Sequence, residues 1–499
     1  MKHLSASDFF GILKNKKSAY WEKEQAAYML EQFHGCAKHI PAYKDFLRKN
    51  GVKPEMVRSY SELDDLPPVG KDSYLRKFPL EKLCYDGTLK EQSLVFTSTS
   101  GSTGAPFYFP RNGILDEQSS MCHEAFLRNS KLDSKKSTLV LVCFGMGVWI
   151  GGVITYQAFK KITERGWNLS ILTPGVNKKE IFAAMKNLAP HYDQIILAGY
   201  PPFMRDVIEE GEAEGIRWKS FDMRLIFAAE AFSEDFREYL MKKTGIKEPY
   251  RHTMNIYGSA DLGTMATETP LAILVRRLAL KKPKLYRKLF KEAHRLPTLA
   301  QFNPHFINFE EIDGHIYITG NNILPLVRYE IGDNGGVRTY DGVAEIFKSE
   351  GFNLEKEIRK AGIKDTVTEL PFVYVYERSD LSVKLYGAII YPEHVKYGLE
   401  RSARLQKYLT GKFTLFTKYD KDHGEYLELN LELRPDTKEN KKLAKEVIKC
   451  VSASLAEKSA EHKNNFDLLG NKVLPRVVFW PHGHPEHFQT GIKQKWVKR

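Results

Sequence analysis

A loop rich in glycine and hydroxyl side chains follows the apolar run 93–96. It reads Thr-Ser-Thr-Ser-Gly-Ser-Thr-Gly-Ala-Pro over residues 97–106. Glycine lets backbone N–H groups approach phosphate oxygens, and hydroxyl groups add hydrogen-bond donors without bulk. No lysine follows Gly104, so the loop is not a P-loop of the GxxxxGK(S/T) type. The composition alone fits a phosphate-binding loop and an ordinary polar connection between strands equally well.

Two further stretches combine glycine with an aromatic ring or a carboxylate. Residues 255–263 read Asn-Ile-Tyr-Gly-Ser-Ala-Asp-Leu-Gly. The ring of Tyr257 can stack on a base, and the carboxylate of Asp261 can bind a metal ion. Residues 326–335 read Leu-Val-Arg-Tyr-Glu-Ile-Gly-Asp-Asn-Gly. Asp333 can accept hydrogen bonds from ribose hydroxyls, although a strand-ending Asp-Asn-Gly turn explains the same pattern.

Histidine and cysteine offer weaker candidates for metal chemistry. Three histidines lie within Trp-Pro-His-Gly-His-Pro-Glu-His over residues 480–487, a spacing that can bind a metal ion. Proline and glycine in that stretch favour a solvated loop, which is the stronger interpretation. The five cysteines are scattered without a CxxC pair, so we expect reduced thiols and no cysteine zinc site.

Short apolar runs that alternate with helical stretches must position these residues. Each run has glycine, serine or alanine at its last or next-to-last position, and the four clearest are 93–100, 138–145, 193–200 and 223–230. This alternation predicts an α/β domain with mainly parallel strands. Ligands bind at the carboxyl ends of the strands in such sheets, so we expect the site where these runs end.

The predicted secondary structure differs before and after this α/β region. Residues 1–75 have apolar positions at helical spacing, and the stretch from about 378 to the end predicts a separate α+β unit. Between them, residues 271–296 contain nine Lys or Arg against one Glu. Their pattern predicts two basic amphipathic helices separated by Pro283. We slightly favour a solvated helical flap over a dock for a membrane or carrier protein.

Charge and hydropathy limit which partners and which cellular location the sequence is compatible with. The net charge of +13, from 75 basic and 62 acidic residues, favours anionic partners without choosing among nucleotides, coenzymes, nucleic acid and acidic membranes. The uncharged run 137–159 is long enough to span a membrane. Its glycine-rich middle and β-branched start instead predict a strand, a loop and a buried helix. The N-terminal residues lack the apolar core of a signal peptide, so we expect a cytoplasmic protein.

Taken together and in this order, the motifs resemble those of the adenylate-forming superfamily of acyl-CoA synthetases. The likeness is greatest to the phenylacetate–CoA ligase branch, with its capsule-biosynthesis adenylating relatives, and it covers most of the chain. Residues 99–104 resemble the family's phosphate loop TSGSTG, and residues 229–234 resemble its GAEPWSE segment. Residues 257–261 resemble its YGxTE motif, 328–335 its RYRTGDxG motif and 377–380 its GRSDD motif.

The resemblance implies a large N-terminal α/β adenylation domain over 1–377, with a helical opening over 1–75 and a basic insertion over 271–300. A small mobile α+β domain would follow over 378–499. The implied reaction is ATP-dependent activation of a carboxylic acid to an acyl adenylate, release of pyrophosphate, and transfer of the acyl group to CoA. ATP, Mg²⁺ and CoA are thus implied as cofactors and substrates, with no nucleic-acid partner.

The resemblance also implies roles for nucleotide-binding residues. Tyr257 beside Gly258 would stack on adenine, and Asp333 and Arg378 would bind the ribose. Asp261 would bind Mg²⁺. The adenine would lie along the 229–234 segment, beside Ala229 and Glu230. The triphosphate would bind to the phosphate loop, through Thr99, Ser100, Gly101, Ser102, Thr103 and Gly104.

The remaining implied roles concern the acid, the hinge and the catalytic cation. The acid would contact Trp149, Gly152 and Tyr200, and this aromatic lining favours an aryl or arylacetic acid. Asp380 would be the hinge of the mobile domain. Adenylation needs a cation beside the reacting carboxylate, and Lys493 is chosen over Lys495 because it lies nearer to Gly491.

Three departures from the family pattern keep alternatives open. Ala260 and Asp261 replace the Thr-Glu of YGxTE, Ala105 stands where relatives often have Lys, and Lys493 does not directly follow a glycine. One alternative keeps adenylation but transfers the acyl group to an amine or a carrier-protein thiol. The other is a non-catalytic basic scaffold with a decayed nucleotide site, against which the retained phosphate loop, Asp333 and Arg378 speak.

Overall fold

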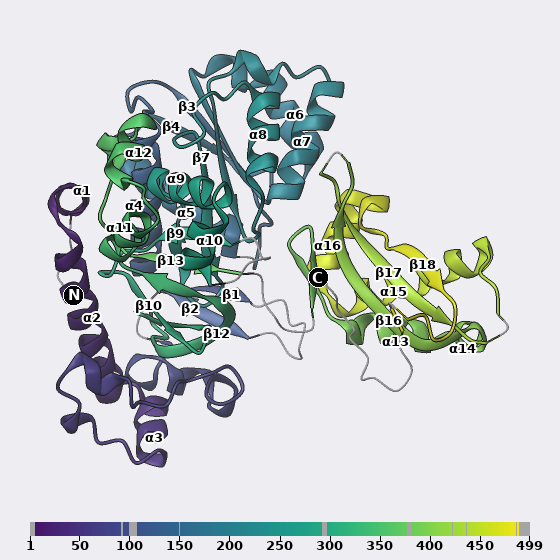
Figure 1. Ribbon diagram of the computed structural model, residues 1–499, viewed down its shortest axis with the longest axis horizontal. Coiled ribbons are helices and arrows are strands. Elements are labelled where there is room, and N and C mark those ends of the chain that lie inside the picture. Colours follow the sequence, from purple (N-terminus) through teal and green to yellow (C-terminus); the bar gives the residue numbers. More distant parts are fainter. Residues whose placement is uncertain are drawn as a thin grey trace. The chain divides into compact units, whose positions relative to one another are not determined.

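The chain divides into two compact units, drawn in Figure 1. The computed structural model describes residues 5–90, 93–98, 107–148, 150–291, 297–376, 382–421, 423–435, 437–485 and 487–488. The first unit comprises Met1–Thr97, Tyr108–Pro201 and Ile208–Arg378, and the second Ser98–Phe107, Pro202–Val207 and Ser379–Arg499. The division predicted between residues 377 and 378 falls in 377–381, which lies outside the described residues.

The first unit begins with three helices, α1 (Ala6–Asn15), α2 (Ser18–His39) and α3 (Pro41–Lys49). Ser5 caps α1 by accepting a hydrogen bond from the Asp8 amide, and Pro41 occupies the first turn of α3, where its missing N–H costs nothing. The hydroxyl of Tyr28 in α2 donates to the Phe306 carbonyl at 2.8 Å. The helical opening therefore packs on the rest of the unit through α2.

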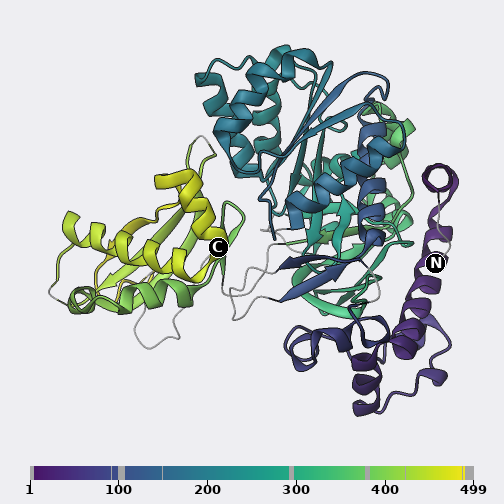
Figure 2. The same ribbon diagram turned by 180° about the vertical axis from the view of Figure 1, so that it is seen from behind.

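A mixed sheet forms the centre of the first unit (Figures 1 and 2). In the described part of the chain it has eleven strands, in the order β10-β11-β12-β13-β9-β8-β7-β6-β5-β3-β4. The bounds are β3 (Thr138–Cys143), β4 (Leu169–Leu172), β5 (Gln194–Gly199), β6 (Met223–Ala228), β7 (Thr253–Ser259), β8 (Gly263–Thr267), β9 (Thr298–Gln301), β10 (Ile307–Ile312), β11 (His315–Gly320), β12 (Leu326–Arg338) and β13 (Phe372–Val375).

Only half of this sheet is parallel. Strands β3 to β7 pair in parallel, whereas β7 to β13 pair antiparallel. The expectation of mainly parallel strands is therefore right for β3–β7 and wrong for the rest. Short turns join β7 to β8 and β10 to β11, and such turns permit only antiparallel pairing. The predicted α/β fold class itself is confirmed.

The part of the run 93–100 that the structure describes, residues 93–98, does not join the central sheet, contrary to the prediction. Its described part forms β1 (Val95–Ser98), which pairs with β2 (Tyr108–Arg111) in a separate two-stranded sheet. The side chains of Val95 and Phe96 are 37% and 43% exposed, whereas every residue of β3 is buried. A strand with that exposure cannot occupy the middle of a sheet that is covered on both faces.

Helices cover the sheet between and after the strands, as Figures 1 and 2 show. Phe126 of α4 and Phe159 of α5 pack against inward-facing residues of β3, β5, β6 and β7. The run 137–159 is thus β3 followed by α5, as predicted, and none of the helices in the described ranges has the length and apolarity of a membrane span. The bounds are α4 (Gly113–Asn129), α5 (Ile150–Glu164), α6 (Lys178–Asn187), α7 (Pro201–Ala213), α8 (Glu234–Thr244), α11 (Tyr340–Ser349) and α12 (Leu354–Lys360).

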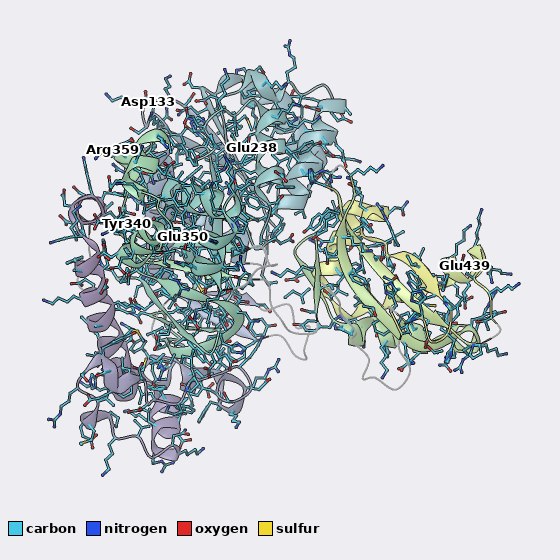
Figure 3. The ribbon with its side chains drawn as sticks, viewed as in Figure 1. Asp133, Glu238, Tyr340, Glu350, Arg359 and Glu439 are labelled. Carbon is cyan, nitrogen blue, oxygen red and sulfur yellow. The ribbon has the colours of Figure 1, made fainter. Side chains whose placement is uncertain are left out.

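The basic segment forms two helices that separate at Pro283, as predicted: α9 (Pro270–Leu280) and α10 (Pro283–Phe290). The expectation of a solvated flap is wrong. Leu271, Leu274 and Leu289 are buried in a core cluster that also contains residues of α11, α12, β9 and β13. Lys288 of α10 forms an ion pair with Glu350 at 2.7 Å. Glu350, labelled in Figure 3, directly follows α11. The apolar stripe therefore faces the protein itself. The basic residues that meet solvent are Lys281, Lys282, Lys284, Arg287, Lys288 and Lys291.

The second unit has an α+β fold of its own. In the described residues after 381, β16, β17 and β18 form a three-stranded sheet, and β14 and β15 form a hairpin. Leu415, Leu429 and Val447 are fully buried between this sheet and α15. The bounds are β14 (Val383–Leu385), β15 (Ala388–Ile390), α13 (Pro392–Glu400), α14 (Ala403–Tyr408), β16 (Leu409–Tyr419), β17 (Glu425–Leu433), α15 (Lys441–Lys458), α16 (Ala460–Leu469) and β18 (Arg476–Trp480).

Candidate active site

The parallel strands bring several predicted site residues to one edge of the sheet. Cys143 at the end of β3 pairs with Gly199 of β5, and Gly199 pairs with Phe227 of β6. Phe227 in turn pairs with Asn255 of β7. The residues at and after these strand ends lie at the same carboxyl edge, which is where such sheets bind ligands. They include Gly152, Tyr200, Ala229, Glu230, Tyr257 and Gly258.

A hydrogen bond joins two of the predicted nucleotide-binding residues. The hydroxyl of Tyr257 in β7 donates to Oδ2 of Asp333 in β12 at 2.6 Å, and both side chains are half-buried. The two residues are 76 positions apart in the chain. The contact therefore brings together two motifs that lie far apart in the sequence.

Asp261 lies beside the same strand. Its Oδ1 accepts a hydrogen bond of 3.3 Å from the hydroxyl of Tyr329, a buried residue of β12 that the sequence did not single out. The turn before Asp261 requires glycine, since a Cβ on Gly258 would lie 2.7 Å from the Gly263 carbonyl oxygen. The two motifs of residues 257–261 and 328–335 therefore meet in one place, at Tyr257–Asp333 and Asp261–Tyr329.

The strand before the predicted phosphate loop, β1, also reaches this place. Thr97, the last residue of the first unit before that loop, donates through Oγ1 to the Ala260 carbonyl at 3.4 Å. Thr97 was not predicted as a site residue, although it opens the hydroxyl-rich run 97–106. Its contact anchors the entry to the loop next to Asp261.

A strained turn follows β6. Ala229 has a φ of 75°, in the left-handed region that costs a non-glycine residue about 1–3 kcal/mol. The side-chain amide of Asn255 in β7 donates to the Glu230 carbonyl at 3.1 Å, and the Glu230 side chain is buried. Ser233 then caps α8 by accepting from the Phe236 amide at 3.1 Å. The turn 229–233 is thus held at both ends, beside Tyr257 on the neighbouring strand.

The residues predicted to contact the acid lie around the ends of β3 and β5. Tyr200 packs edge-to-face on Phe144 with ring centroids 5.1 Å apart. Gly152 starts α5 in close contact with the preceding loop, because a Cβ there would lie 2.5 Å from both the Gly145 carbonyl oxygen and the Met146 sulfur. The aromatic side chains of Phe144 and Tyr200 and the sulfur of Met146 therefore lie near the ends of β3 and β5.

Several predicted site residues cannot be placed in this way. Trp149, Arg378, the hinge residue Asp380 and the catalytic candidate Lys493 lie outside the described residues. So does the phosphate loop itself, with Thr99, Ser100, Gly101, Ser102, Thr103 and Gly104.

The histidines of 480–487 show no metal site. His484 and His487 pack on the ring of Trp480, with centroids 4.4 and 4.1 Å away. Within the part of the chain that the structure describes, no group of three His, Cys, Asp or Glu side chains is arranged to hold a metal ion. The stacking ties this stretch to β18.

Arg328, within the predicted nucleotide motif, faces the N-terminal helices. Its guanidinium donates to the carbonyls of Leu63, Asp64 and Leu66, the last at 2.8 Å, and lies 3.2 Å from Glu310. Burial raises the pKa of Glu310 to about 7, and the nearby Arg328 offsets only part of that rise. Arg328 thus fixes the 63–66 segment against β12, a structural role that the sequence motif did not reveal.

This geometry predicts a pH-dependent stability. Because the folded-state pKa of Glu310 lies above its ordinary value of 4.5, the folded chain binds this proton more tightly than the unfolded chain. The stabilisation is complete below about pH 4.5 and is lost as the pH rises through about 7. Denaturant unfolding at pH 5 and pH 7.5 should therefore show a smaller pH dependence in Glu310→Gln than in the wild type. Equal pH dependence in both proteins would contradict the assignment.

Comparison with known proteins identifies other structures that have this fold. No protein-family model and no curated protein matches the sequence. Solved structures do match. A 2-hydroxyisobutyryl-CoA ligase in complex with 2-HIB-AMP and CoA, in the thioesterification state, has a TM-score of 0.63 and 14% identity, covering 97% of this chain and 90% of that one.

Two further structures of that ligase match over similar lengths. The postadenylation state with R3-HIB-AMP has a TM-score of 0.55 and 12% identity, covering 98% of this chain and 91% of that one. An open conformation with 2-HIB-AMP and CoA has a TM-score of 0.53 and 13% identity, covering 97% and 93%. The likeness extends over both the α/β part and the smaller α+β part. The protein therefore has the fold of the adenylate-forming acyl-CoA ligases.

Proposed function

We propose that this protein activates a carboxylic acid with ATP, forming an acyl adenylate and releasing pyrophosphate, and then transfers the acyl group to CoA. The observation that carries the proposal is the hydrogen bond between Tyr257 and Asp333, which unites two nucleotide-type motifs at the ligand-binding edge of the sheet. The likeness in fold to a CoA ligase solved with an acyl-AMP and CoA supports the same reaction.

In this proposal the described residues hold the nucleotide. Asp333 accepts hydrogen bonds from the ribose hydroxyls, held in place by the Tyr257 hydroxyl. The Tyr257 ring and the turn with Ala229 and Glu230 flank the adenine. The phosphate loop 99–104, which follows β1 and the contact of Thr97 with Ala260, binds the triphosphate through backbone N–H groups and hydroxyls.

Asp261 fits the binding of Mg²⁺ together with ATP. Mg²⁺ in nucleotide sites is commonly held by one or two carboxylates, with phosphate oxygens and waters completing the shell. Asp261 provides one carboxylate, and its Oδ1 is oriented by the Tyr329 hydroxyl. The ion would supply charge neutralisation on the phosphates when bound.

We propose an aryl or arylacetic acid as the substrate, as in the phenylacetate–CoA ligase branch that the motifs resemble. The edge-to-face pair of Phe144 and Tyr200 supports an aromatic ligand at the acid position. A short 2-hydroxy acid is the second candidate, because the matching ligase structures hold 2-HIB-AMP.

ATP–pyrophosphate exchange tests the proposal. The purified chain is assayed with aryl, arylacetic, short 2-hydroxy and fatty acids, with and without Mg²⁺, and CoA is then added. We expect Mg²⁺-dependent exchange with one acid class and a thioester after CoA addition. Exchange without thioester formation would move the acceptor to an amine or a carrier-protein thiol. ATP binding without exchange for any acid would instead support a non-catalytic scaffold.

A further inference from the structure

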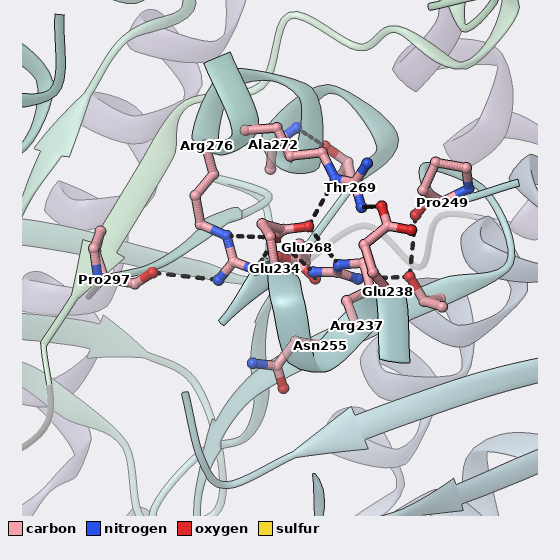
Figure 4. Close-up of polar contacts among 12 residues, drawn as sticks. Glu234, Arg237, Glu238, Pro249, Asn255, Glu268, Thr269, Ala272, Arg276 and Pro297 are labelled. Atoms are coloured by element: carbon pink, nitrogen blue, oxygen red, sulfur yellow. Dashed lines mark hydrogen bonds and ion pairs between the residues drawn. The ribbon is translucent and has the colours of Figure 1, made fainter. Parts of the chain in front are cut away.

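A cluster of buried charges, drawn in Figure 4, gathers around Glu234, which directly follows the turn 229–233. Arg237 of α8, Arg276 of α9 and Glu268 after β8 have almost no exposed surface. Glu234, the first residue of α8, and Arg277 of α9 complete the cluster with partial exposure. Arg276 and Arg277 belong to the basic segment that the sequence presented as a surface feature.

The contacts within the cluster converge on Glu234. Its carboxylate accepts from Nε of Arg237 at 3.0 Å, from Nε of Arg276 at 3.0 Å and from Nε of Arg277 at 2.7 Å. Glu268 bridges the two buried arginines, at 2.7 Å from Arg237 and 3.3 Å from Arg276. The three guanidinium groups hold the pKa of Glu234 below its usual range despite burial. Glu234 is thus an ionised acceptor that ties α8 to α9.

The same two arginines cover the turn itself. The guanidinium of Arg237 lies over the ring of Phe232 at 5.0 Å, and that of Arg276 lies over it at 5.7 Å. Phe232 is buried and packs on Phe227 at the end of β6 with centroids 4.9 Å apart. Arg277 differs here, because its guanidinium lies over Tyr250 instead. Arg276 therefore contacts the turn on both sides of Ser233, through Phe232 and through Glu234.

Stability alone does not account for a cluster of this kind. Buried ion pairs lose hydration, and well-packed apolar side chains of similar volume are often as stable. Such a cluster does fix geometry, since guanidinium groups bind carboxylates in set directions. The turn needs that fixing, because Ala229 holds a φ of 75°.

We propose that Arg276 of α9 is a positioning residue for nucleotide binding, which acts by holding the strained turn 229–233 through Glu234 and Phe232. The proposal rests on the proposed function, in which this turn flanks the adenine. It gives the buried side of the basic segment a role: α9 supports the nucleotide site from the side opposite the ligand.

The test compares a charge-balanced double variant with a matched control. Arg276→Gln combined with Glu268→Gln removes one charge of each sign, and Arg276→Lys keeps the charge without the planar group. Arg277→Gln is the control, because Arg277 binds the same Glu234 but does not contact Phe232. Hydrogen exchange of the 229–236 amides is measured without ligand, and ATP affinity by calorimetry. In pyrophosphate exchange, KM and kcat are measured for ATP and for the acid.

We expect faster amide exchange in the turn and an ATP KM raised about tenfold or more in the double variant, with kcat at saturating ATP and the KM for the acid changed less than about twofold. Arg276→Lys should be intermediate, and Arg277→Gln should resemble the wild type. Equal effects of the control, or a parallel loss of kcat and of both KM values, would overturn the proposal. A wild-type chain that binds no ATP would refute the proposed function, whereas hydrogen exchange would still decide whether Arg276 holds the turn.

Discussion

Replacing Lys493 with alanine is expected to lower the rate of adenylate formation roughly 10²–10³-fold, the effect of one lost transition-state contact. The attacking carboxylate and the α-phosphate are both anionic, so a cation between them lowers the barrier. In enzymes that the sequence resembles, a lysine near the chain end provides this cation in the first half-reaction only. Thioester formation from presynthesised acyl adenylate should therefore remain nearly unchanged.

The two half-reactions, measured separately, decide the assignment. Lys495→Ala is the matched control, since it lies two residues away in the same basic stretch. Equal losses in both half-reactions for Lys493→Ala would indicate a structural role. No loss in either would transfer the assignment to Lys495 or remove it from this stretch altogether.

Asp333→Ala is expected to weaken ATP binding by roughly 1.5–3 kcal/mol, or about 10- to 150-fold. The ribose hydroxyls would lose a charged acceptor, and the Tyr257 hydroxyl would lose its partner at 2.6 Å. Calorimetry with ATP measures the change directly. Glu330→Ala is the matched control, because Glu330 is an exposed carboxylate three residues earlier in the same strand.

A second variant separates the two contributions at this position. Tyr257→Phe keeps the ring that would stack on adenine and removes only the hydroxyl that orients Asp333. We expect a smaller loss of ATP affinity than in Asp333→Ala. Wild-type affinity in Asp333→Ala would exclude this carboxylate from the nucleotide site, and the proposed function would then lose its main structural support.

The site combines short local motifs with long-range contacts. Tyr257 comes from β7 and Asp261 from the turn that follows it. Asp333 and Tyr329 come from β12, which is not a neighbour of β7 in the sheet order. Behind them, α9 reaches the 229–233 turn through Arg276. Asp333→Ala, Tyr257→Phe and the Arg276 variants each change one of these connections.

The sequence by itself determined the features that depend on local pattern. The alternation of apolar runs and helical stretches predicted the α/β class, and the glycines of 145–152 predicted that 137–159 divides into a strand and a helix. Pro283 predicted the break between α9 and α10. These features follow from backbone preferences and side-chain periodicity within about twenty residues, so neighbouring residues are enough to specify them.

Only the tertiary structure decided which faces are buried and which distant residues meet. An amphipathic stripe has the same pattern whether it faces a membrane or the protein's own core. The nine basic residues in 271–296 therefore suggested a solvated flap, which the burial of Leu274 and Arg276 excludes. The sequence placed Arg328 and Asp333 in one motif, yet Arg328 binds the 63–66 segment. Of these two residues, Asp333 is the one that forms a hydrogen bond with Tyr257. Pairing across 76 residues depends on how the whole sheet assembles, and no local preference encodes it.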